Sequence, residues 1–423
     1  MNGFEKEDLS IVITAHNEGR LAKCSIESLL CAAKELETIG VKYKFYVNID
    51  NGDKKTIDFF RMYNEQKIVV YNTSFGDPGL SRNYVSKKVN GKYIALIDAD
   101  DAISENWLMD AYKIISSTRK NILVHPEVEI RYDKKKLCSV DIRTNLENSW
   151  QDNLALIFGN RWCSIVMGKR DIFLKSQYPV NGHGFGYEDY YFNCETVYKN
   201  VRHLVVKNTT AFCLLKEEST NKKAIINHEV LPYTRLFGLR RLKKYERFFG
   251  FPSIKDKHKM IKVKGFVVRH CKEFNSINSG FFAMVEKELC GLKVDTGCAY
   301  EYLKFGKLYC DMVRNVKPRS IRVGNIFFVN NVVDFMELSG CKRDDIFIVM
   351  ENNNNLPRKK NVIYFGWFLN GQSDFVKDEL LTRITVQLKV KKISTCKNCS
   401  VKKWISEHSL FIKSNNIDIE YVA

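Results

Sequence analysis

The sequence lacks the features that mark secreted and membrane-spanning proteins. It has no run of about 18 apolar residues, which a transmembrane helix requires. The opening residues, MNGFEKED, contain no apolar stretch of the kind found in signal peptides, so we expect a cytoplasmic protein. The 423 residues are too many for one ordinary hydrophobic core. We therefore expect roughly two or three domains.

A disulfide framework is also missing. The 13 cysteines are odd in number and scattered, and several lie in apolar surroundings, such as Cys24, Cys31 and Cys213. This pattern is typical of reduced, buried thiols in a cytosolic protein. Cys396 and Cys399 form a CxxC pair, but a zinc site needs about four ligands, and no second pair or HxxxH motif follows. A structural role is therefore favoured over a metal or redox role.

Positive charge is unevenly distributed along the chain. The formal net charge of the whole sequence is +18. Up to Thr220, 30 Lys and Arg residues are nearly matched by 29 Asp and Glu residues, whereas the remainder holds 37 against 20. A basic excess confined to one half indicates two parts with different roles, one of which faces an anionic partner.

Strand-like and helix-like patterns alternate near the N-terminus. Strands are predicted at 9–14, 45–49, 67–71 and 93–97, and helices at 18–38, 57–63 and 80–89. This alternation predicts a mostly parallel sheet in a doubly wound, Rossmann-like α/β domain, where ligands bind beyond the carboxyl ends of the strands. Polar clusters follow three of these strands and should converge on one crevice; they lie at 14–18, 50–53 and 98–101.

The whole chain divides into three predicted regions. Residues 1–224 form the α/β domain, which also contains a strand at 122–132 and a helix from Glu188. Residues 225–320 have the pattern of a basic helical region. Residues 321–423 return to short strands and predict a small α/β module; the strands are at 326–329, 346–350 and 362–365.

Three carboxylates end the stretch YIALIDADD, residues 93–101. Like charges this close raise each other's pKa unless a cation lies among them. Asp98 and Asp100, at i and i+2 of an extended segment, would share a side, where both could bind a Mg²⁺ or Mn²⁺ ion that bridges a diphosphate. The alternative is that Asp100 or Asp101 caps a helix starting near Ser104. A cap explains one carboxylate but not three, so a metal site is favoured.

A second acidic pair follows a glycine-rich loop at 182–186. Glu188 and Asp189 begin a predicted helix, where the helix dipole favours carboxylates. Capping explains their position, but a general base delivered by a loop becomes the stronger interpretation beside a metal site upstream. Arg82, early in the helix predicted at 80–89, is either a solvated residue or a cation that faces donor phosphates.

Four motifs, in this order, resemble those of inverting family 2 glycosyltransferases with the GT-A fold. They are LSIVITAHNE at 9–18, IDNGD at 49–53, GLSRNYVSKKVNGKYIALIDADD at 79–101 and GYEDYYF at 186–192. The resemblance covers about residues 8–220. His16 departs from it, because the family often has Tyr or Phe there, and Asn51 replaces a second acidic residue.

The resemblance implies a role for each motif. Asp100 would be the first choice of metal ligand for Mn²⁺ or Mg²⁺, Asp98 would face the ribose or the metal, and Asp101 would complete the site. Asp189 would be the catalytic base, and Glu188 would position the acceptor. A nucleotide-sugar, with a UDP-sugar as the expected donor, would be held by Thr14, Ala15, His16, Asn17, Glu18, Asp50 and Arg82.

The acceptor and any membrane contact are open at this level. Asn160, Arg161 and Trp162 are candidates for lining an acceptor site, although a core position suits Trp162 equally well. Residues 235–272 contain 13 Lys and Arg against 2 Asp and Glu, with apolar residues at helical spacing. Such a helix suits either the anionic inner face of a membrane or packing on the catalytic domain. A membrane would make the expected acceptor a lipid-linked glycan of a surface polysaccharide.

Other classes of function fit less well. A nucleotidyltransferase with a similar core would carry a glycine-rich basic loop after the first strand, and HNEGR at 16–20 is not such a loop. A sugar-nucleotide-binding or membrane-scaffold protein with a retired active site would have lost its acidic residues, yet all of those named above are present. No nucleic-acid-binding motif accompanies the basic charge, so we expect no nucleic acid partner.

Overall fold

The computed structural model describes most of the first 238 residues and shorter segments beyond them. Residues 7–238 are described, except for gaps at 64–67, 134–136, 144, 146–155, 158, 181, 183 and 217–218. The described C-terminal segments are 260–262, 293–295, 326–329, 346–349, 362–364, 374–387, 389–390, 392–396 and 400–422.

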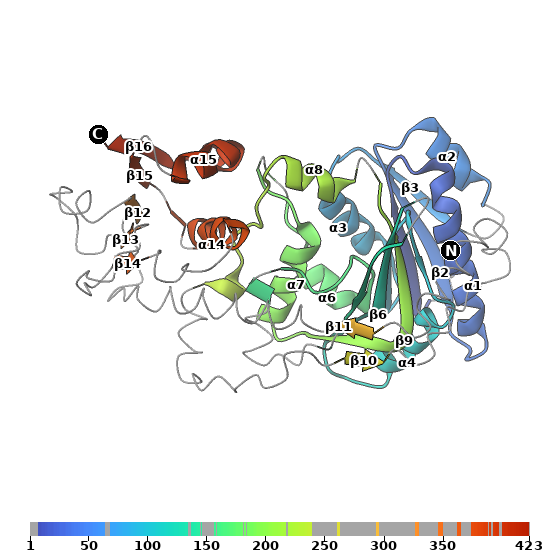
Figure 1. The fold of residues 1–423 in the computed structure, drawn as a ribbon. Helices are drawn as coiled ribbons and strands as arrows, with labels where there is room; N and C mark the ends of the chain where they lie inside the picture. Colours follow the sequence, from blue (N-terminus) through green and yellow to red (C-terminus); the bar gives the residue numbers. More distant parts are fainter. Residues whose placement is uncertain are drawn as a thin grey trace.

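Parallel strands form one half of the central sheet (Figure 1). Its order is β3-β2-β1-β4, from β1 (Leu9–Ala15), β2 (Tyr43–Asp50), β3 (Val69–Thr73) and β4 (Tyr93–Asp98). Helices α1 (Ala22–Glu37), α2 (Lys54–Arg61) and α3 (Pro78–Lys88) connect them. The predicted alternation is thus confirmed. Because the strands are parallel, Thr14 lies beside both Asn48 and Asp98, and the three polar clusters share one edge.

The other half of the sheet is mixed. It continues from β4 through β8 (Val166–Lys169), β6 (Ile122–Tyr132), β9 (Arg202–Leu214) and β5 (Asp101–Ile103), with β7 (Leu137–Ile142) beside β6. β8 is antiparallel to β4 and β6, whereas β6 and β9 are parallel. Helices α4 (Trp107–Ser116), α6 (Arg170–Lys175) and α7 (Glu188–Tyr198) accompany these strands. The mostly parallel arrangement expected from the sequence therefore holds for the first half only, and the α/β class is confirmed.

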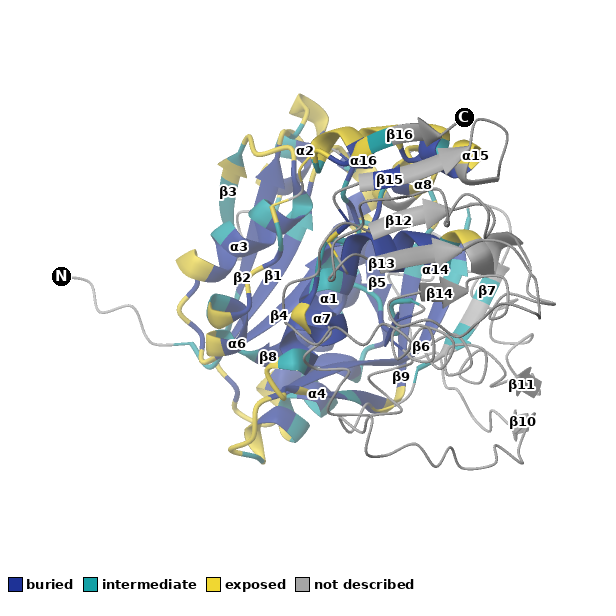
Figure 2. Cartoon of the chain, turned by 90° about the vertical axis from the view of Figure 1, so that its left-hand side faces the viewer, coloured by how far each residue is buried: buried dark blue, intermediate teal, exposed yellow. Residues whose placement is uncertain are grey.

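Alternating side chains of β1 and β4 enter two separate cores, which Figure 2 shows as buried layers on the sheet. Ile11 and Ile13 belong to the core that includes α1 and α4, whereas Val12 belongs to the core that includes α3, α6 and α7. In β4, Ile94 and Leu96 lie in this second core. The period of two then places Asp98 on the side of α3 and α7.

Local capping sets the starts of the connecting helices. The Asp53 carboxylate accepts a hydrogen bond from the Thr56 backbone N–H at 2.8 Å and so caps α2. The Asp77 carboxylate caps α3 through the Leu80 N–H at 2.8 Å, with Pro78 at the first turn. These caps explain why both helices begin a few residues before the apolar periodicity predicted.

The described C-terminal segments contain both strands and helices. The predicted strands are confirmed as β12 (Ile326–Val329), β13 (Ile346–Val349) and β14 (Val362–Tyr364), which form a parallel sheet. Farther on lie α14 (Asp374–Gln387), β15 (Lys392–Cys396), α15 (Ser400–Glu407), α16 (Ser409–Ser414) and β16 (Asp418–Val422). Of the region predicted to be helical, the described segments β10 (Met260–Lys262) and β11 (Lys293–Asp295) are strands.

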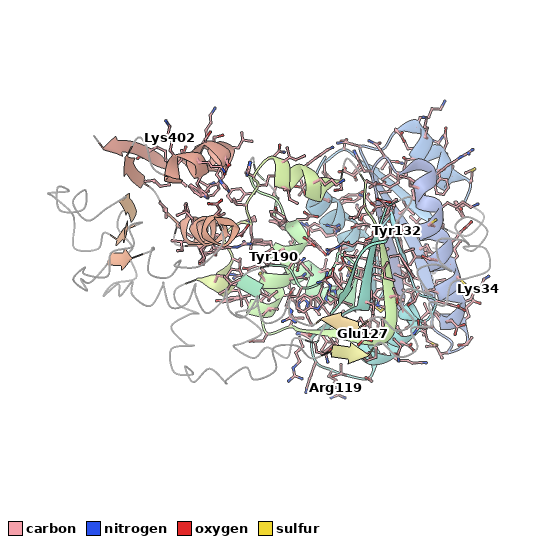
Figure 3. All side chains as sticks on the ribbon, in the orientation of Figure 1. Lys34, Arg119, Glu127, Tyr132, Tyr190 and Lys402 are labelled. Atoms are coloured by element: carbon pink, nitrogen blue, oxygen red, sulfur yellow. The ribbon has the colours of Figure 1, made fainter. Side chains whose placement is uncertain are left out.

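Helix α14 packs against the helix that carries the acidic pair. The Arg383 guanidinium lies 5.2 Å from the ring centroid of Tyr190 on α7. Tyr190 is labelled in Figure 3. The Gln387 side-chain oxygen accepts a hydrogen bond from the Thr234 N–H at 3.2 Å. Phe185, just before α7, meets Phe411 of α16 edge to face at 5.8 Å between ring centroids. The C-terminal segments thus support the surroundings of the candidate base.

Most of the predicted amphipathic helix at 235–272 lies outside the described residues. Its first residues form a short 3₁₀ turn, η3 (Arg235–Phe237), which follows α8 (Thr220–Ile226). Leu236 and Phe237 are buried, and Arg235 pairs with Glu195 of α7 at 2.5 Å. This short piece therefore packs on the α/β domain. Across the part of the chain that the structure describes, no helix has the length and apolar character needed to cross a bilayer.

Candidate active site

Asp98 joins three elements at the carboxyl edge of the sheet. Its carboxylate accepts hydrogen bonds from the Thr14 hydroxyl at 2.6 Å and from the Ser164 hydroxyl at 2.6 Å. A backbone hydrogen bond also connects the ends of the two strands, because the Ala99 N–H donates to the Thr14 carbonyl at 2.9 Å. The ends of β1 and β4 and the segment before β8 are therefore held together around one carboxylate.

Arg82 bridges the two acidic motifs. Its Nη2 donates to both oxygens of Asp98, at 2.8 and 3.0 Å, and its Nη1 donates to Oε1 of Glu188 at 2.7 Å. The side chain is only 5% exposed. Burial by itself would raise the pKa of Asp98, but the nearby Arg82 charge and the hydroxyl donors reverse this and lower it. Arg82, predicted to bind the nucleotide, thus also connects the donor end to the acid motif.

Asp98 and Asp100 contact different cations, which corrects the expectation that they share one side. β4 ends at Asp98, so Ala99 and Asp100 lie in a turn and no longer follow the period of a strand. The Asp100 carboxylate lies 2.8 Å from Nζ of Lys216. The same ammonium lies 3.1 Å from Oε1 of Glu18, at the end of the first motif. Lys216 had no assigned role in the sequence.

Asp101 begins a strand rather than a helix. It is the first residue of β5 and pairs with Cys213 of β9. The helix cap suggested for it is wrong, because α4 begins at Trp107 with Asn106 at its N-cap position. Burial raises the pKa of Asp101 well above its usual range, and the nearby charges of Asp100 and Asp98 raise it further. Burial raises the pKa of Asp100 as well, so the pKa shifts alone do not separate these two carboxylates as metal ligands.

Asp189 stands at the first turn of α7 with both oxygens held by hydrogen bonds. Oδ2 accepts from the Asn160 side-chain amide at 2.8 Å, and Oδ1 accepts from the Tyr190 N–H at 2.7 Å. Burial raises its pKa, the charge of Glu188 adds to this, and the result is about 7. Before the helix, Tyr187 adopts a left-handed backbone (φ 62°), a strained conformation that is common at functional sites.

The three acceptor candidates lie in different surroundings. Asn160 binds two residues of α7, because its side-chain amide donates to Asp189 and its side-chain oxygen accepts from the Asn193 amide at 2.9 Å. The Arg161 N–H donates to that same oxygen at 3.0 Å. Trp162 is 2% exposed, and the hydrogen-bonded imidazoles of His125 and His203 stack on its indole ring. Trp162 is thus a core residue and offers no open ring face to a sugar.

The residues predicted to face the nucleotide are linked by hydrogen bonds into a corner between the ends of β1 and β2. His16 Nδ1 donates to the Asp50 carbonyl at 2.5 Å, and the side-chain oxygen of Asn17 accepts from the Asp53 N–H at 2.7 Å. The Asp50 carboxylate accepts from the Thr73 hydroxyl at 2.9 Å and from the Phe75 N–H at 2.7 Å. Asp50 therefore shapes the loop after β3. The adjacent Ala15 is buried.

Gly52 closes the same corner and has no room for a side chain. A Cβ atom there would lie 2.1 Å from Cγ2 of Ile49 and 3.0 Å from the His16 carbonyl oxygen. The turn after β2 therefore requires glycine, as the IDNGD motif suggested. Asn51, which replaces an acidic residue of the resembled family, takes a left-handed conformation with φ 50°.

A divalent ion fits this edge of the sheet through Asp100. Within the described residues, no group of three or more His, Cys, Asp or Glu side chains could hold a metal ion by itself. Asp98 is already bonded to Arg82, Thr14 and Ser164, whereas Asp100 has one cation partner, Lys216, and its side chain is 18% exposed. Mg²⁺ and Mn²⁺ need only one or two carboxylates when a substrate diphosphate supplies other ligands. Asp100 with a diphosphate meets that need.

Two contributors to the site were missed by sequence reasoning. Ser164 precedes β8 and Lys216 follows β9, and each reaches the motif carboxylates from a distant part of the chain. Neither lies in a recognisable pattern. For Lys216, the only sequence clue was that it follows a long strand, β9, which ends at the carboxyl edge of the sheet.

The family comparison agrees with the motifs. Residues 10–173 match the model of glycosyl transferase family 2. This match confirms the resemblance for these residues, which make up less than half of the chain, and the mixed α/β sheet agrees with the GT-A type of fold. The acid motif at 186–192 lies beyond the matched residues. No curated protein matches the chain.

Several solved structures are similar to part of the chain. One is TarS 1–349 of S. aureus, with 15% sequence identity and a TM-score of 0.38, covering 49% of this chain and 60% of that one. Another is the mannosyltransferase PcManGT of Pyrobaculum calidifontis in complex with GDP-Man and Mn²⁺, with 11% identity and a TM-score of 0.40, covering 59% of this chain and 66% of that one. The chain thus spans less than two thirds of the length of each.

Proposed function

We propose that the chain is a metal-dependent inverting glycosyltransferase that moves a sugar from a nucleotide-sugar to an acceptor hydroxyl. One observation carries the proposal: Asp189 is a fixed carboxylate whose pKa burial and the charge of Glu188 raise to about 7. A general base works best with a pKa near the working pH. Through Glu188 and Arg82, this base is connected to Asp98 at the donor end of the crevice.

The proposed reaction is a single displacement. Ionised Asp189 takes the proton of the acceptor hydroxyl, and the oxygen forms a bond to the anomeric carbon of the donor sugar. The bond from that carbon to the diphosphate oxygen breaks, and the nucleoside diphosphate leaves with the electron pair. Attack from the side opposite the leaving group inverts the anomeric configuration. A divalent ion held by Asp100 would neutralise the charge that develops on the diphosphate.

The surrounding residues prepare the base before the substrates arrive. The Asn160 amide and the Tyr190 N–H each hold one oxygen of Asp189, which fixes the direction of its lone pairs. Arg82 forms ion pairs with Asp98 and Glu188 at the same time. The negative charge of Glu188 in turn keeps Asp189 basic. Orientation of this kind reduces the entropy cost of reaching the transition state.

The finer parts of the proposal concern substrates and location. We propose a UDP-sugar as donor and a lipid-linked glycan of a surface polysaccharide as acceptor. The chain would be cytoplasmic and peripheral at the inner face of a membrane, with residues 235–272 on anionic lipid. The basic excess of the C-terminal half supports this location. The regions 1–224, 225–320 and 321–423 remain the proposed division into domains.

A donor panel tests the activity directly. UDP-, GDP- and dTDP-sugars would be titrated by calorimetry with Mn²⁺ and followed for hydrolysis and transfer. We expect binding of one nucleotide class and slow hydrolysis of its sugar, with hydrolysis lost in Asp189→Asn while binding remains. Absence of both binding and hydrolysis would contradict a transferase. Binding without any turnover would favour a sugar-nucleotide-binding protein.

Membrane docking needs a separate measurement. The full chain would be floated with vesicles of phosphatidylglycerol and, as the neutral control, with vesicles of phosphatidylcholine. We expect flotation with the anionic vesicles only, weakened by raised salt because the attraction is electrostatic. Equal behaviour with both lipids would remove the membrane from the proposal and leave the donor chemistry unaffected.

A further inference from the structure

Lys216 places a positive charge where the donor end is most acidic. Its ammonium lies 2.8 Å from Oδ2 of Asp100 and 3.1 Å from Oε1 of Glu18. The lysine side chain is 27% exposed, so this ion pair is partly shielded from water. Glu18 is fixed in turn, because its Oε2 accepts from the His16 N–H at 2.5 Å. The ammonium is therefore held by two carboxylates that belong to two different motifs.

Asp100 cannot bind Lys216 and a divalent ion through the same carboxylate oxygen at once. A Mg²⁺ or Mn²⁺ ion lies about 2.1 Å from a ligand oxygen, so an ion on Oδ2 would be at most about 5 Å from Nζ in this arrangement. Two cations at that distance in a partly buried site repel strongly. Asp98 offers no replacement, because Arg82, Thr14 and Ser164 already occupy its oxygens.

We propose that Lys216 is a positioning residue that occupies Asp100 in the free protein and competes with the divalent ion for it. The inference rests on the proposed donor site. Metal affinity is then low without a nucleotide, and it rises when a diphosphate supplies further oxygen ligands. Glu18 retains the displaced ammonium, since it already holds it at 3.1 Å. The donor and the ion consequently bind as a pair rather than the ion alone.

The test measures Mn²⁺ binding to the full chain without any nucleotide, by following free Mn²⁺ in an electron paramagnetic resonance titration. Lys216→Met should bind Mn²⁺ roughly tenfold or more tightly than the unsubstituted protein, because a charge-assisted contact no longer competes. Lys207→Met is the matched control. Lys207 lies in β9 and pairs with Glu127, so the variant loses the same charge without touching Asp100. Its Mn²⁺ affinity should stay unchanged.

A second pair of variants assigns the effect to the carboxylate. Adding Asp100→Asn to Lys216→Met should abolish the gain in affinity. Lys216→Gln keeps a polar side chain of similar length, and it should reproduce the gain if Lys216→Met folds poorly, as checked by thermal unfolding. Equal Mn²⁺ affinity of the Lys216 variants and the unsubstituted protein would overturn the proposal, as would a gain that survives Asp100→Asn.

The outcome is independent of the test of the proposed function. Mn²⁺ binding is measured without donor, so a tighter Lys216→Met variant would support the competition even if no nucleotide-sugar binds. Conversely, donor binding and turnover with an unchanged Lys216→Met affinity would leave the transferase intact and reject the competition. Each of the two proposals can therefore be rejected without rejecting the other.

Discussion

Asp98 and Asp189 have pKa values that their surroundings shift in opposite directions. At the donor end, Asp98 and Asp100 each contact a cation, Arg82 and Lys216 respectively. At the other end, the oxygens of Asp189 accept hydrogen bonds from an amide and a backbone N–H. The pKa of Asp98 is lowered, whereas burial and Glu188 raise that of Asp189 to about 7. The neighbours of each aspartate, rather than its residue type, thus set the direction of its pKa shift.

The largest loss of activity is expected when the proposed base, Asp189, is removed. Asp189→Asn keeps the shape and the helix start but cannot accept a proton, so turnover should fall by roughly 10² to 10⁴. Single-turnover transfer with saturating donor would measure the loss. Asp171→Asn, at an exposed surface pair with Lys175, is the matched control and should retain full activity. Full activity of Asp189→Asn would mean that another group is the base.

Removing the cation between the two ends should cost stability. Arg82→Met leaves Asp98 and Glu188 without their shared partner, and we expect a loss of about 3–5 kcal/mol in the free energy of unfolding. Urea unfolding would measure it. Arg61→Met removes an exposed pair with Asp58 and should change stability by less than about 1 kcal/mol. Similar values for both variants would show that Arg82 does not hold the two motifs together.

The negative charge of Glu188 should set the pH at which activity rises. Activity requires ionised Asp189, so kcat/KM should rise with pH through its pKa of about 7. In Glu188→Gln the negative neighbour is gone, the pKa of Asp189 falls, and the acidic limb of the profile should move to lower pH. Glu37→Gln, at the exposed end of α1, should leave the limb in place. A limb that moves upward or stays unchanged in Glu188→Gln would contradict this assignment.

The smallest effect is expected at the third acid of the motif. Burial and the charges of Asp100 and Asp98 raise the pKa of Asp101 well above its usual range, and Asp101 lies inside the sheet as the first residue of β5. Asp101→Asn should therefore leave both turnover and metal dependence nearly unchanged. Asp100→Asn, one residue away, should weaken the metal dependence of donor binding clearly. A strong loss in Asp101→Asn, measured in the same titration with Mn²⁺, would return Asp101 to the set of metal ligands.

The sequence predicted the sheet half that its motifs describe. Nearly continuous apolar runs in β1 and β4 were sufficient to identify both strands, because each strand is buried on its two faces. The edge where Thr14, Asp50 and Asp98 meet also followed, since parallel strands end together. The helix that begins at Glu188 was predicted at the correct residue because capping is a local effect.

Contacts between distant segments could not be predicted. Lys216 reaches Glu18 across nearly 200 positions, and no local pattern encodes such a pair. The separation of Asp98 from Asp100 depends on where β4 stops, which periodicity does not determine to one residue. For Trp162, the sequence gave no sign of the buried His125 and His203 imidazoles that stack on its ring.

The packing of α14 on α7 has a consequence for synthesis of the protein. The chain leaves the ribosome from its N-terminus, so the donor-end strands can pair early, whereas the partners of the base helix come about 200 residues later. Until Arg383 and Phe411 have emerged, Tyr190 lacks its contact with the Arg383 guanidinium and Phe185 lacks its contact with the Phe411 ring. On the ribosome, the strands that lead to His16 and Asp50 would therefore fold first, and the surroundings of Asp189 would be completed last.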